Sequence, residues 1–557
     1  MKKQLRSNFE KGTLRWATRR AMWKVLGYND ADMEKPKIAI VNSSSNLAVC
    51  FSHLDDIAKK LSDAIYAAGG VAFEVRTTAP SDFITAAGRK GGYIQSSRDL
   101  IVNDIEAAVE GAQFDGMVCL ASCDKTVPGQ IMAAGRLNIP TIVVACGYQP
   151  SGKYRGEHID IEDLFIQTGH LAAGKITLEE LTEMTDNAIL GPGVCPGMGT
   201  ANSMHMVTEA LGMALPGSTP VLANSPKMWD AVQVAAERIV QMVWDDLKPR
   251  DILTPEAFAN AVKVMLSVSG SINSVKHLQA IARESKCDVD VYELFSRLGA
   301  EIPLLTGIRP NGDHLIEDLE AAGGARAVMK QLEKHMCKNA KTVTGQTVGE
   351  ILRDTVVVDE EIIRSVERPL ARRPSIVLVK GSLAADYGIV KLAVTDDRPT
   401  LFTGKAITYE SQSAAIAGVE NGDVKPGMVV VIRGLGVKGN PGMALASSCI
   451  FAIDGAGLTG KVAVVTDGLV SGLVNRTLLV AEISPEAAVG GPLALVENGD
   501  MIKIDVENRV CDLEVPEDVL AERRKHMKNF LDTSDCGWLS IYQRTVKQLS
   551  DGAVLIP

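Results

Sequence analysis

Short apolar runs alternate with amphipathic segments through the first 150 residues of the chain. The apolar runs have the continuous hydrophobic character of strands that are buried on both faces, and the segments between them have helical spacing. The predicted strands are 37–41, 71–75, 116–120 and 141–144, and the predicted helices begin near 54 and span 97–111 and 128–137. Such alternation predicts a mostly parallel sheet with right-handed crossovers.

Two other patterns occur before residue 370. An amphipathic helix is predicted over 8–27 at the start of the chain. From 226 to 356 the pattern is almost entirely helical, with amphipathic segments at 228–247, 255–266, 272–285 and 325–336. We find no candidate chemistry in this long helical stretch and interpret it as scaffold.

The character of the chain changes around an arginine-rich linker flanked by Pro369 and Pro374. Beyond it, short β-type runs separated by Gly, Asp and Asn turns predict a barrel-like sheet. These runs are 376–379, 389–392, 429–432, 462–465, 493–496, 501–504 and 509–513, and helix is predicted again over 516–548. We therefore expect an α/β protein with an N-terminal parallel-sheet α/β domain (1–369) and a C-terminal β-barrel-like domain (370–557).

Composition narrows the class of protein. A chain of 557 residues exceeds what one hydrophobic core usually supports, and 46% hydrophobic with 23% charged residues is typical of a globular protein. A net charge of −10 argues against a nucleic-acid partner. The N-terminal segment lacks the apolar core of a signal peptide, and no apolar run is long enough to span a membrane. We expect a cytoplasmic protein with reduced cysteines and a small-molecule partner.

The most informative stretch is Cys123-Asp124-Lys125, which follows the apolar strand 116–120 and precedes a helix. Ligands of open α/β sheets collect at the carboxyl ends of strands, so a thiol, a carboxylate and an amine at one strand exit indicate a metal-bearing site. The alternative is a small buried cysteine beside a solvated turn, because free cysteine is commonly buried and inert. These residues alone do not decide between the two.

Three further stretches carry candidate chemistry. Cys50 lies between a strand end and the helix that starts near residue 54, and Cys195 lies in a Gly- and Pro-rich stretch, 191–204. Glycines there let the backbone approach a bulky ligand, although the loop also reads as a simple helix cap. Ser471 follows a strand in a glycine-flanked turn, where its hydroxyl is either exposed to a ligand or only part of the turn.

These motifs occur together in an order that resembles the dihydroxy-acid dehydratase and phosphogluconate dehydratase family. The resemblance runs through Cys50, Cys123-Asp-Lys, Cys195-Pro-Gly-Met-Gly-Thr-Ala-Asn-Ser-Met, Pro441-Gly-Met and Thr466-Asp-Gly-x-x-Ser-Gly to Ile483-Ser-Pro-Glu-Ala-Ala, and covers nearly the whole chain. It implies an active site between an α/β domain and a barrel domain, in a homodimer or a dimer of dimers. It also implies that Cys50, Cys123 and Cys195 bind an iron–sulfur cluster, of [2Fe–2S] type because of Cys50. The remaining cysteines, including Cys119 in the strand, are expected to play no part in it.

The same resemblance implies a cation site and a catalytic base. Asp82, Asp124 and a carbamylated Lys125 match ligands of a Mg²⁺ ion, and Ser471 matches the base that acts as an alkoxide. A cluster with one under-ligated iron can act as a Lewis acid on a leaving hydroxyl, and a hard cation stabilises the carbanion next to a carboxylate. The implied reaction is dehydration of a 2,3-dihydroxy acid to a 2-keto acid by a hydro-lyase.

The chain departs from the family pattern at Leu445, where a glutamate normally completes the Mg²⁺ shell. Leucine cannot bind Mg²⁺, so occupancy by this ion is in question. Arg89 and the pair Leu469-Val470 also replace the residue types usual at those positions, and Arg89 is a candidate partner for a substrate carboxylate if its loop covers the site. The alternatives are a hydro-lyase for a different hydroxy acid without a full Mg²⁺ site, and a diverged homologue whose cluster is structural or redox-sensing. A zinc hydrolase fits less well, since no His-rich or Cys-x-x-Cys pair is present.

Overall fold

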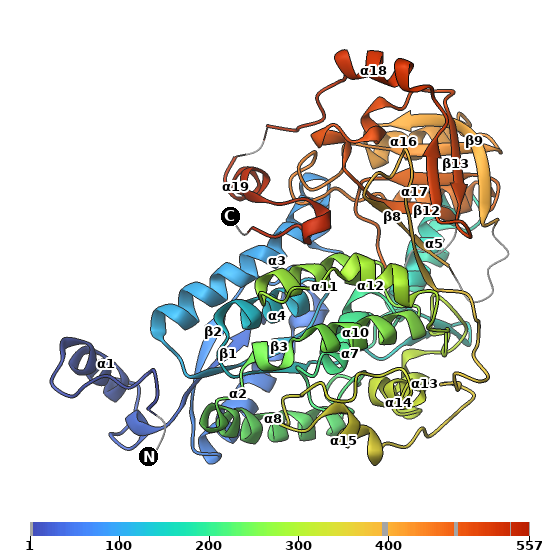
Figure 1. The fold of residues 1–557 in the computed structure, drawn as a ribbon. Helices are drawn as coiled ribbons and strands as arrows, with labels where there is room; N and C mark the ends of the chain where they lie inside the picture. Colours follow the sequence, from blue (N-terminus) through green and yellow to red (C-terminus); the bar gives the residue numbers. More distant parts are fainter. Residues whose placement is uncertain (1–3, 393–398, 473–476, 535, 556–557) are drawn as a thin grey trace.

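The computed structural model describes residues 4–392, 399–472, 477–534 and 536–555 (Figure 1). A four-stranded parallel sheet of order β2-β1-β3-β4 organises the N-terminal part. Its strands and the helices between them are β1 (Lys37–Asn42), α2 (Leu54–Ala67), β2 (Val71–Arg76), α3 (Gly92–Ile105), β3 (Gly116–Ala121), α4 (Thr126–Leu137) and β4 (Thr141–Ala145). The predicted parallel sheet is confirmed.

Both faces of this sheet are covered, which explains the unbroken apolar runs in the sequence. β1 and β3 are buried along their whole length. Helices α2 and α8 (Pro226–Asp245) pack against the strands on one face, and α4, with α3 beside it, packs on the other (Figure 1). Because parallel strands end at the same edge, the loops after β1, β2 and β3 meet there.

A layer of helices extends the N-terminal part below and beside the sheet. Its members are α7 (Thr200–Ala210), α9 (Pro249–Ile252), α10 (Pro255–Ser267), α11 (Asn273–Glu284), α12 (Val291–Leu298), α13 (Ile316–Ala321), α14 (Gly324–Gln331) and α15 (Val348–Arg353). Helices α7, α10 and α11 are buried almost all round, as expected for core helices. The amphipathic segments predicted in this region are confirmed, with ends that differ by a few residues.

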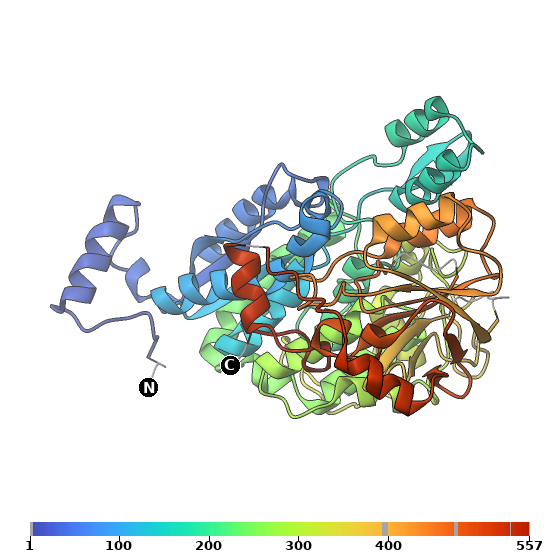
Figure 2. The ribbon, with the colours of Figure 1, turned by 90° about the horizontal axis from the view of Figure 1, so that it is seen from above.

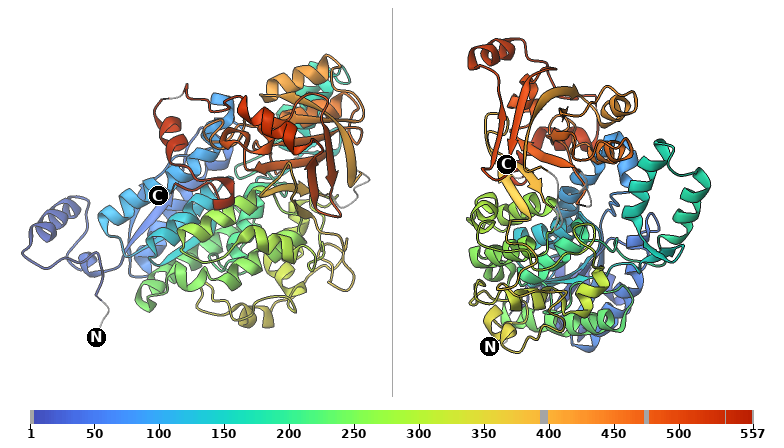
Figure 3. Two further views of the ribbon diagram at one scale, coloured as in Figure 1. Left: turned by 45° about the horizontal axis from the view of Figure 1, so that its top comes forward. Right: turned by 90° about the vertical axis from the view of Figure 1, so that its right-hand side faces the viewer.

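Two peripheral segments complete the N-terminal part. Helix α1 (Leu14–Val25) extends from the body and has no buried residue (Figure 2). A small lobe contains the hairpin β5–β6 (Gly152–Tyr154 and Glu157–Ile159), α5 (Ile161–Ala172) and α6 (Leu178–Asn187). This lobe lies against the C-terminal part (Figure 3), where the rings of Phe165 in α5 and Phe451 in α17 (Ser447–Gly455) stack at 5.7 Å.

An eight-stranded sheet of order β14-β13-β9-β10-β11-β12-β8-β7 forms the C-terminal part. The strands are β7 (Ile376–Val379), β8 (Tyr387–Lys391), β9 (Leu401–Tyr409), β10 (Met428–Ile432), β11 (Ala463–Thr466), β12 (Leu478–Ser484), β13 (Met501–Asp505) and β14 (Val510–Leu513). Lys380, directly after β7, forms a parallel bridge with Val510 in β14, so the two edge strands meet. The sheet is therefore barrel-like, as predicted.

Side chains of the barrel strands alternate between two cores. Val429 and Val431 of β10 belong to the barrel interior, whereas Val430 and Ile432 join the large core that includes the N-terminal sheet. Because strand side chains point alternately to opposite faces, one strand contributes to both cores. The barrel thereby packs directly on the N-terminal part, and the predicted boundary near residue 370 falls in the segment between α15 and β7.

The structure corrects several sequence predictions. The run 493–496 is not a strand: Pro492 to Leu495 form a 3₁₀ helix with the proline in its first turn, where the missing N–H costs nothing. Strand β9 was not predicted because Gly404 interrupts its pattern, and a Cβ at Gly404 would lie 2.3 Å from the Gly427 carbonyl oxygen. The pattern also missed β12, α16 (Gln412–Glu420) and α17.

The predicted C-terminal helix is two helices, α18 (Glu517–Lys525) and α19 (Trp538–Thr545). Among the described residues, no helix combines the length and the apolar character that crossing a bilayer requires.

Candidate active site

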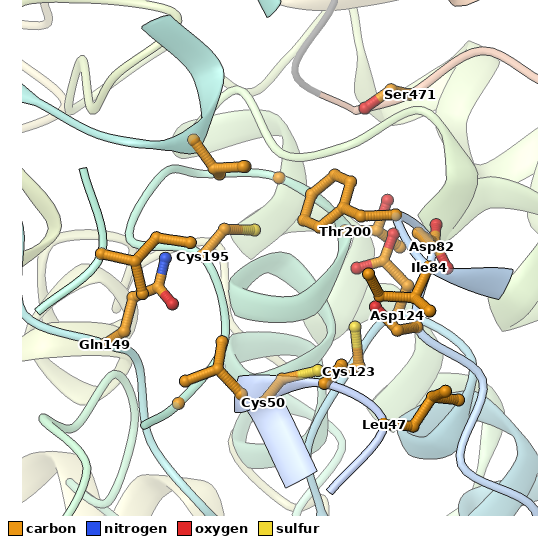
Figure 4. Close-up of a pocket in the computed structure, with 18 of the residues that line it drawn as sticks. Leu47, Cys50, Asp82, Ile84, Cys123, Asp124, Gln149, Cys195, Thr200 and Ser471 are labelled. Atoms are coloured by element: carbon orange, nitrogen blue, oxygen red, sulfur yellow. The ribbon is translucent and has the colours of Figure 1, made fainter. Parts of the chain in front are cut away.

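A cavity of about 350 Å³ opens where the two parts of the molecule meet (Figure 4). Six of the seven residues singled out in the sequence line it: Cys50, Asp82, Cys123, Asp124, Cys195 and Ser471. The seventh, Lys125, is fully buried directly behind the two carboxylates. The volume of the cavity is that of a pocket for a small organic molecule.

Strand exits explain why these residues meet. Cys50 lies in the short 3₁₀ turn between β1 and α2, and Asp82 follows β2. Cys123 and Asp124 lie between β3 and α4, so three neighbouring parallel strands supply four of the residues. The fifth, Cys195, comes from the loop before α7, and Ser471 comes from the loop between β11 and β12 of the barrel.

All three cysteines line the cavity, with Cys50 and Cys123 side by side and Cys195 on another side (Figure 4). A hydrogen bond between Cys50 and Cys123, together with burial, raises the pKa of the Cys123 thiol well above its usual value. Burial and the nearby Asp124 carboxylate likewise raise the pKa of Cys195. Three thiols that line one cavity fit a cationic centre, which would bind them as thiolates. The donor set therefore fits an iron–sulfur cluster.

Buried side chains donate hydrogen bonds to the backbone of the loops that carry these cysteines. Ser122 Oγ donates to the Cys50 carbonyl, and His205 Nε2 donates to the Ser122 carbonyl at 3.0 Å. Burial lowers the pKa of His205 to about 4, so this imidazole is neutral at physiological pH. Asn202 Nδ2 donates to the Cys195 carbonyl at 2.9 Å. The loops that carry the cysteines are thus fixed by hydrogen bonds rather than by packing alone.

Asp82, Asp124 and Lys125 form a second polar group beside the thiols. Lys125 Nζ lies 3.3 Å from Asp82 Oδ2 and 3.8 Å from Asp124 Oδ2. Burial and the Asp124 charge raise the pKa of Asp82; burial alone would lower the pKa of Lys125, but Asp82 and Asp124 raise it. Asp82 Oδ1 is buried and has no hydrogen-bond partner among the described residues. An unpartnered buried oxygen beside a second carboxylate fits a divalent cation that prefers oxygen ligands.

Hydrophobic side chains form much of the remaining wall of the cavity, beside the polar side chains of Asn46, Ser81, Gln149 and Thr200. None of the residues that line it in the described part of the chain is a lysine, arginine or histidine. The apolar members are Leu47, Ala48, Val49, Phe83, Ile84, Ile161 and Ile189. The Phe83 ring is backed by Phe165 of α5 at 5.2 Å, which joins this wall to the stacked pair between α5 and α17. Sequence reasoning missed this wall, because these residues have no motif and come from four separate segments.

Leu445 and Arg89, the two departures noted in the sequence, lie at the rim between the domains. The Leu445 N–H donates to the Lys90 carbonyl at 3.1 Å, and its side chain covers Gly91, where a Cβ would lie 2.9 Å from Leu445 Cγ. Arg89 Nη2 donates to Ser534 Oγ at 3.2 Å, on the C-terminal segment. In this structure Arg89 thus faces Ser534, and it is not among the residues that line the cavity.

Comparison with known proteins identifies the family of the chain. Family models described as dihydroxy-acid/6-phosphogluconate dehydratase N-terminal and C-terminal match residues 35–351 and 361–553. The chain is 38% identical over 553 residues to a dihydroxy-acid dehydratase of Acetivibrio thermocellus, covering 99% of this chain and 100% of that protein. It is 40% identical over 549 residues to one of Methanococcus maripaludis, covering 98% of this chain and 99% of that protein. The chain therefore belongs to the dihydroxy-acid/6-phosphogluconate dehydratase family.

Proposed function

We propose that the protein is a hydro-lyase that converts an aliphatic 2,3-dihydroxy acid to a 2-keto acid in the cavity between its two domains. The observation that carries the proposal is the composition of that cavity: three thiols, two carboxylates, the Ser471 hydroxyl and a set of apolar side chains line the same space. Relatives named dihydroxy-acid dehydratase, matched over nearly their whole length, support the reaction class.

Separate residues of the cavity bind the cluster, bind the cation and remove the proton in this proposal. Cys50, Cys123 and Cys195 would hold an iron–sulfur cluster of [2Fe–2S] type, and Asp82 and Asp124 would hold Mg²⁺. When bound, the cluster supplies Lewis acidity toward the leaving hydroxyl and the cation stabilises negative charge on the substrate. Ser471, as its alkoxide, takes the proton from C2, while the C3–O bond breaks and the hydroxyl takes a proton and leaves as water. The resulting enol tautomerises to the 2-keto acid by losing its O–H proton and gaining one at C3.

Lys125 needs a chemical change to take part in cation binding. As an ammonium between two carboxylates it is a donor only and repels a cation. Reaction with CO₂ forms a carbamate and releases two protons, which turns the side chain into an anionic oxygen ligand. The buried position of Lys125 supports this assignment, because a carbamate there would replace the ion pairs with contacts to the cation.

The apolar wall favours an aliphatic substrate over a sugar acid or its phosphate. Residues such as Leu47, Ile161 and Ile189 offer no hydrogen bonds to additional hydroxyls, and burying an unpaired hydroxyl costs about 1 to 3 kcal/mol. A phosphate would further need cationic partners, which the described lining residues lack. The substrate side chain that fits best is a short branched hydrocarbon.

Turnover by anaerobically purified protein tests the proposal. Iron, sulfide and magnesium are measured, and keto-acid formation is compared for 2,3-dihydroxy-3-methylbutanoate, gluconate and 6-phosphogluconate. We expect kcat/KM for the branched acid to exceed that for either sugar acid by at least about tenfold. A preference for gluconate or 6-phosphogluconate would overturn the assignment of the wall, and a protein that keeps its cluster but turns over none of them would favour a structural or redox role.

The same proposal includes a homodimer. The exposed helix α1, which carries Leu14, Met22 and Val25 on its surface, is consistent with a second copy nearby. Light scattering of the purified protein measures the mass directly, and a monomer at micromolar concentration would contradict this part of the proposal.

A further inference from the structure

The loop that carries Ser471 is held by hydrogen bonds from three different elements. The Ser471 N–H donates to Ser447 Oγ at 2.9 Å, and Lys391 Nζ donates to the Gly472 carbonyl at 3.0 Å. On the other side, Asn273 Nδ2 donates to the Val470 carbonyl at 3.1 Å. Of these three bonds, the third comes from the N-terminal part, which also carries the thiols and carboxylates. The place of Ser471 relative to those groups therefore depends on Asn273.

The Asn273 amide can donate to the Val470 carbonyl in one orientation only. Its Nδ2 donates to Thr200 Oγ1 at 3.0 Å as well as to the Val470 carbonyl, and its Oδ1 accepts from Lys276 Nζ. An ammonium is a donor without acceptor capacity, so it must face Oδ1. A flipped amide would set its NH₂ against the ammonium and its oxygen against the Val470 carbonyl, two repulsive contacts in a buried place. The charge on Lys276 thus fixes the direction of the Asn273 amide.

Lys276 is in turn fixed by Glu482 of the barrel. The two side chains form an ion pair and are both completely buried. Glu482 lies in β12 where the register with β8 shifts between Ala481 and Ser484, and its φ is +52°. Such a bulge re-aims a side chain, here toward α11 of the N-terminal part. A glutamate in the left-handed region is strained, and a buried ion pair is seldom more stable than an apolar replacement, so stability alone does not explain this arrangement.

We propose that Glu482 and Lys276 are positioning residues, which fix the amide of Asn273 so that it holds the Ser471 loop over the thiols and carboxylates. The series Glu482, Lys276, Asn273, Val470 runs from the barrel into α11 and back to the barrel. This positioning role rests on the proposed function, in which Ser471 removes a proton. It also revises the interpretation of 226–356 as scaffold only, because α11 contacts the loop that bears the proposed base.

Three variants of the full-length protein test the inference. Asn273→Asp keeps the acceptor that faces Lys276 but replaces the donor that faces Val470, at almost the same size. The double variant Lys276→Met/Glu482→Gln removes both charges together, so that neither is left buried without its partner. The matched control is Glu284→Gln, on the same helix and also in an ion pair, with Arg136 at 2.6 Å, away from the Ser471 loop.

We expect both test variants to retain iron content and to lose at least about tenfold in kcat with little change in KM, because a displaced catalytic group weakens the chemical step. The control should retain its kcat. A variant that only weakens the fold would lower the melting temperature and leave kcat unchanged below it. Unchanged kcat in both test variants, measured well below their melting temperatures, would overturn the positioning role.

Hydrogen exchange separates failure of this inference from failure of the proposed function. Amide exchange of the Ser471 segment, followed by mass spectrometry, should become faster in both test variants and stay the same in Glu284→Gln, since it reports the hydrogen bonds themselves. Unchanged exchange in both would overturn the inference whatever the activity. If the native protein turns over no dihydroxy acid, the proposed function fails, and the exchange result still decides whether this series holds the loop.

Discussion

Gly472→Ala is the smallest change that moves Ser471 without touching its hydroxyl. The backbone of Gly472 is not left-handed, so alanine adds no dihedral strain there. The added Cβ would instead lie 2.3 Å from Ser271 Oγ, 2.7 Å from Ser271 Cβ and 3.1 Å from the Thr200 nitrogen. Each of these contacts is shorter than the usual 3.5 to 4 Å between non-bonded atoms.

The size of the effect follows from these distances. To relieve a contact of 2.7 Å with a carbon, the loop must withdraw by roughly 1 Å. A displacement of about 1 Å in a catalytic constellation costs on the order of 10²-fold in rate, which corresponds to about 2.7 kcal/mol in the activation free energy. Because Ser471 is the neighbouring residue, we expect kcat to fall by about this factor while the thiols keep their cluster.

The assay is keto-acid formation from 2,3-dihydroxy-3-methylbutanoate at saturating concentration, with iron content and melting temperature measured on the same samples. Gly111→Ala is the control, since a Cβ there meets nothing within 4 Å. The double variant Gly472→Ala/Ser271→Gly removes the two closest atoms and should recover part of the rate. A Gly472→Ala protein with kcat within about threefold of the native value would refute the claim that the position of Ser471 limits the reaction.

Three further predictions concern the cluster, the cation and the pH dependence of stability. Cys195→Ser should lose the visible absorption and the iron of the cluster, whereas Cys146→Ser, which is fully buried and does not line the cavity, should keep both; full retention in the first would remove Cys195 from the ligand set. Leu445→Glu should bind Mg²⁺ more tightly than the native protein in isothermal titration, because it adds a carboxylate; equally tight binding by both would mean that Leu445 is no sign of an incomplete shell. Burial raises the pKa of Glu486 to about 7, so the folded state keeps a proton that the unfolded state releases, and native stability should fall as pH rises from about 5 to 7. In urea denaturation Glu486→Gln should therefore gain stability relative to the native protein over this range, and a difference that does not change with pH would contradict the assignment.

Much of the N-terminal fold and of the candidate site follows from local sequence. The buried strands β1 and β3 have unbroken apolar runs, and a parallel sheet places Cys50 and Cys123 at strand ends on the same edge. That β1 and β3 pair directly, which makes the two cysteines neighbours, is seen in the structure, and the sequence implied their joint role only through resemblance to a family. The place of Cys195 and Ser471 in the same cavity was predicted only through resemblance to a family. No local pattern carries it, because those loops come from other parts of the chain.

Long-range contacts account for what the sequence did not reveal. Asn273 and the Val470 carbonyl are 197 residues apart, and nothing in the amphipathic pattern of α11 distinguishes a buried asparagine that faces a loop from one that faces a helix. The turn of Glu482 toward Lys276 depends on a bulge in β12, a strand that the pattern missed. Strand β9 was also missed, because Gly404 suggests a turn in the sequence. In the structure, its lack of a side chain allows a close approach to the backbone of Gly427.

The most direct test of the central claim is proton transfer at the substrate by Ser471. Native protein and Ser471→Ala, both purified without oxygen and matched in iron content, are incubated with 2,3-dihydroxy-3-methylbutanoate in D₂O and followed by NMR. The account predicts that the native protein forms the 2-keto acid with one deuterium at C3, and that Ser471→Ala does so at least about 10²-fold more slowly. Equal rates for the two proteins would contradict the assignment of Ser471 as the base, and no keto acid from the native protein would contradict the proposed reaction.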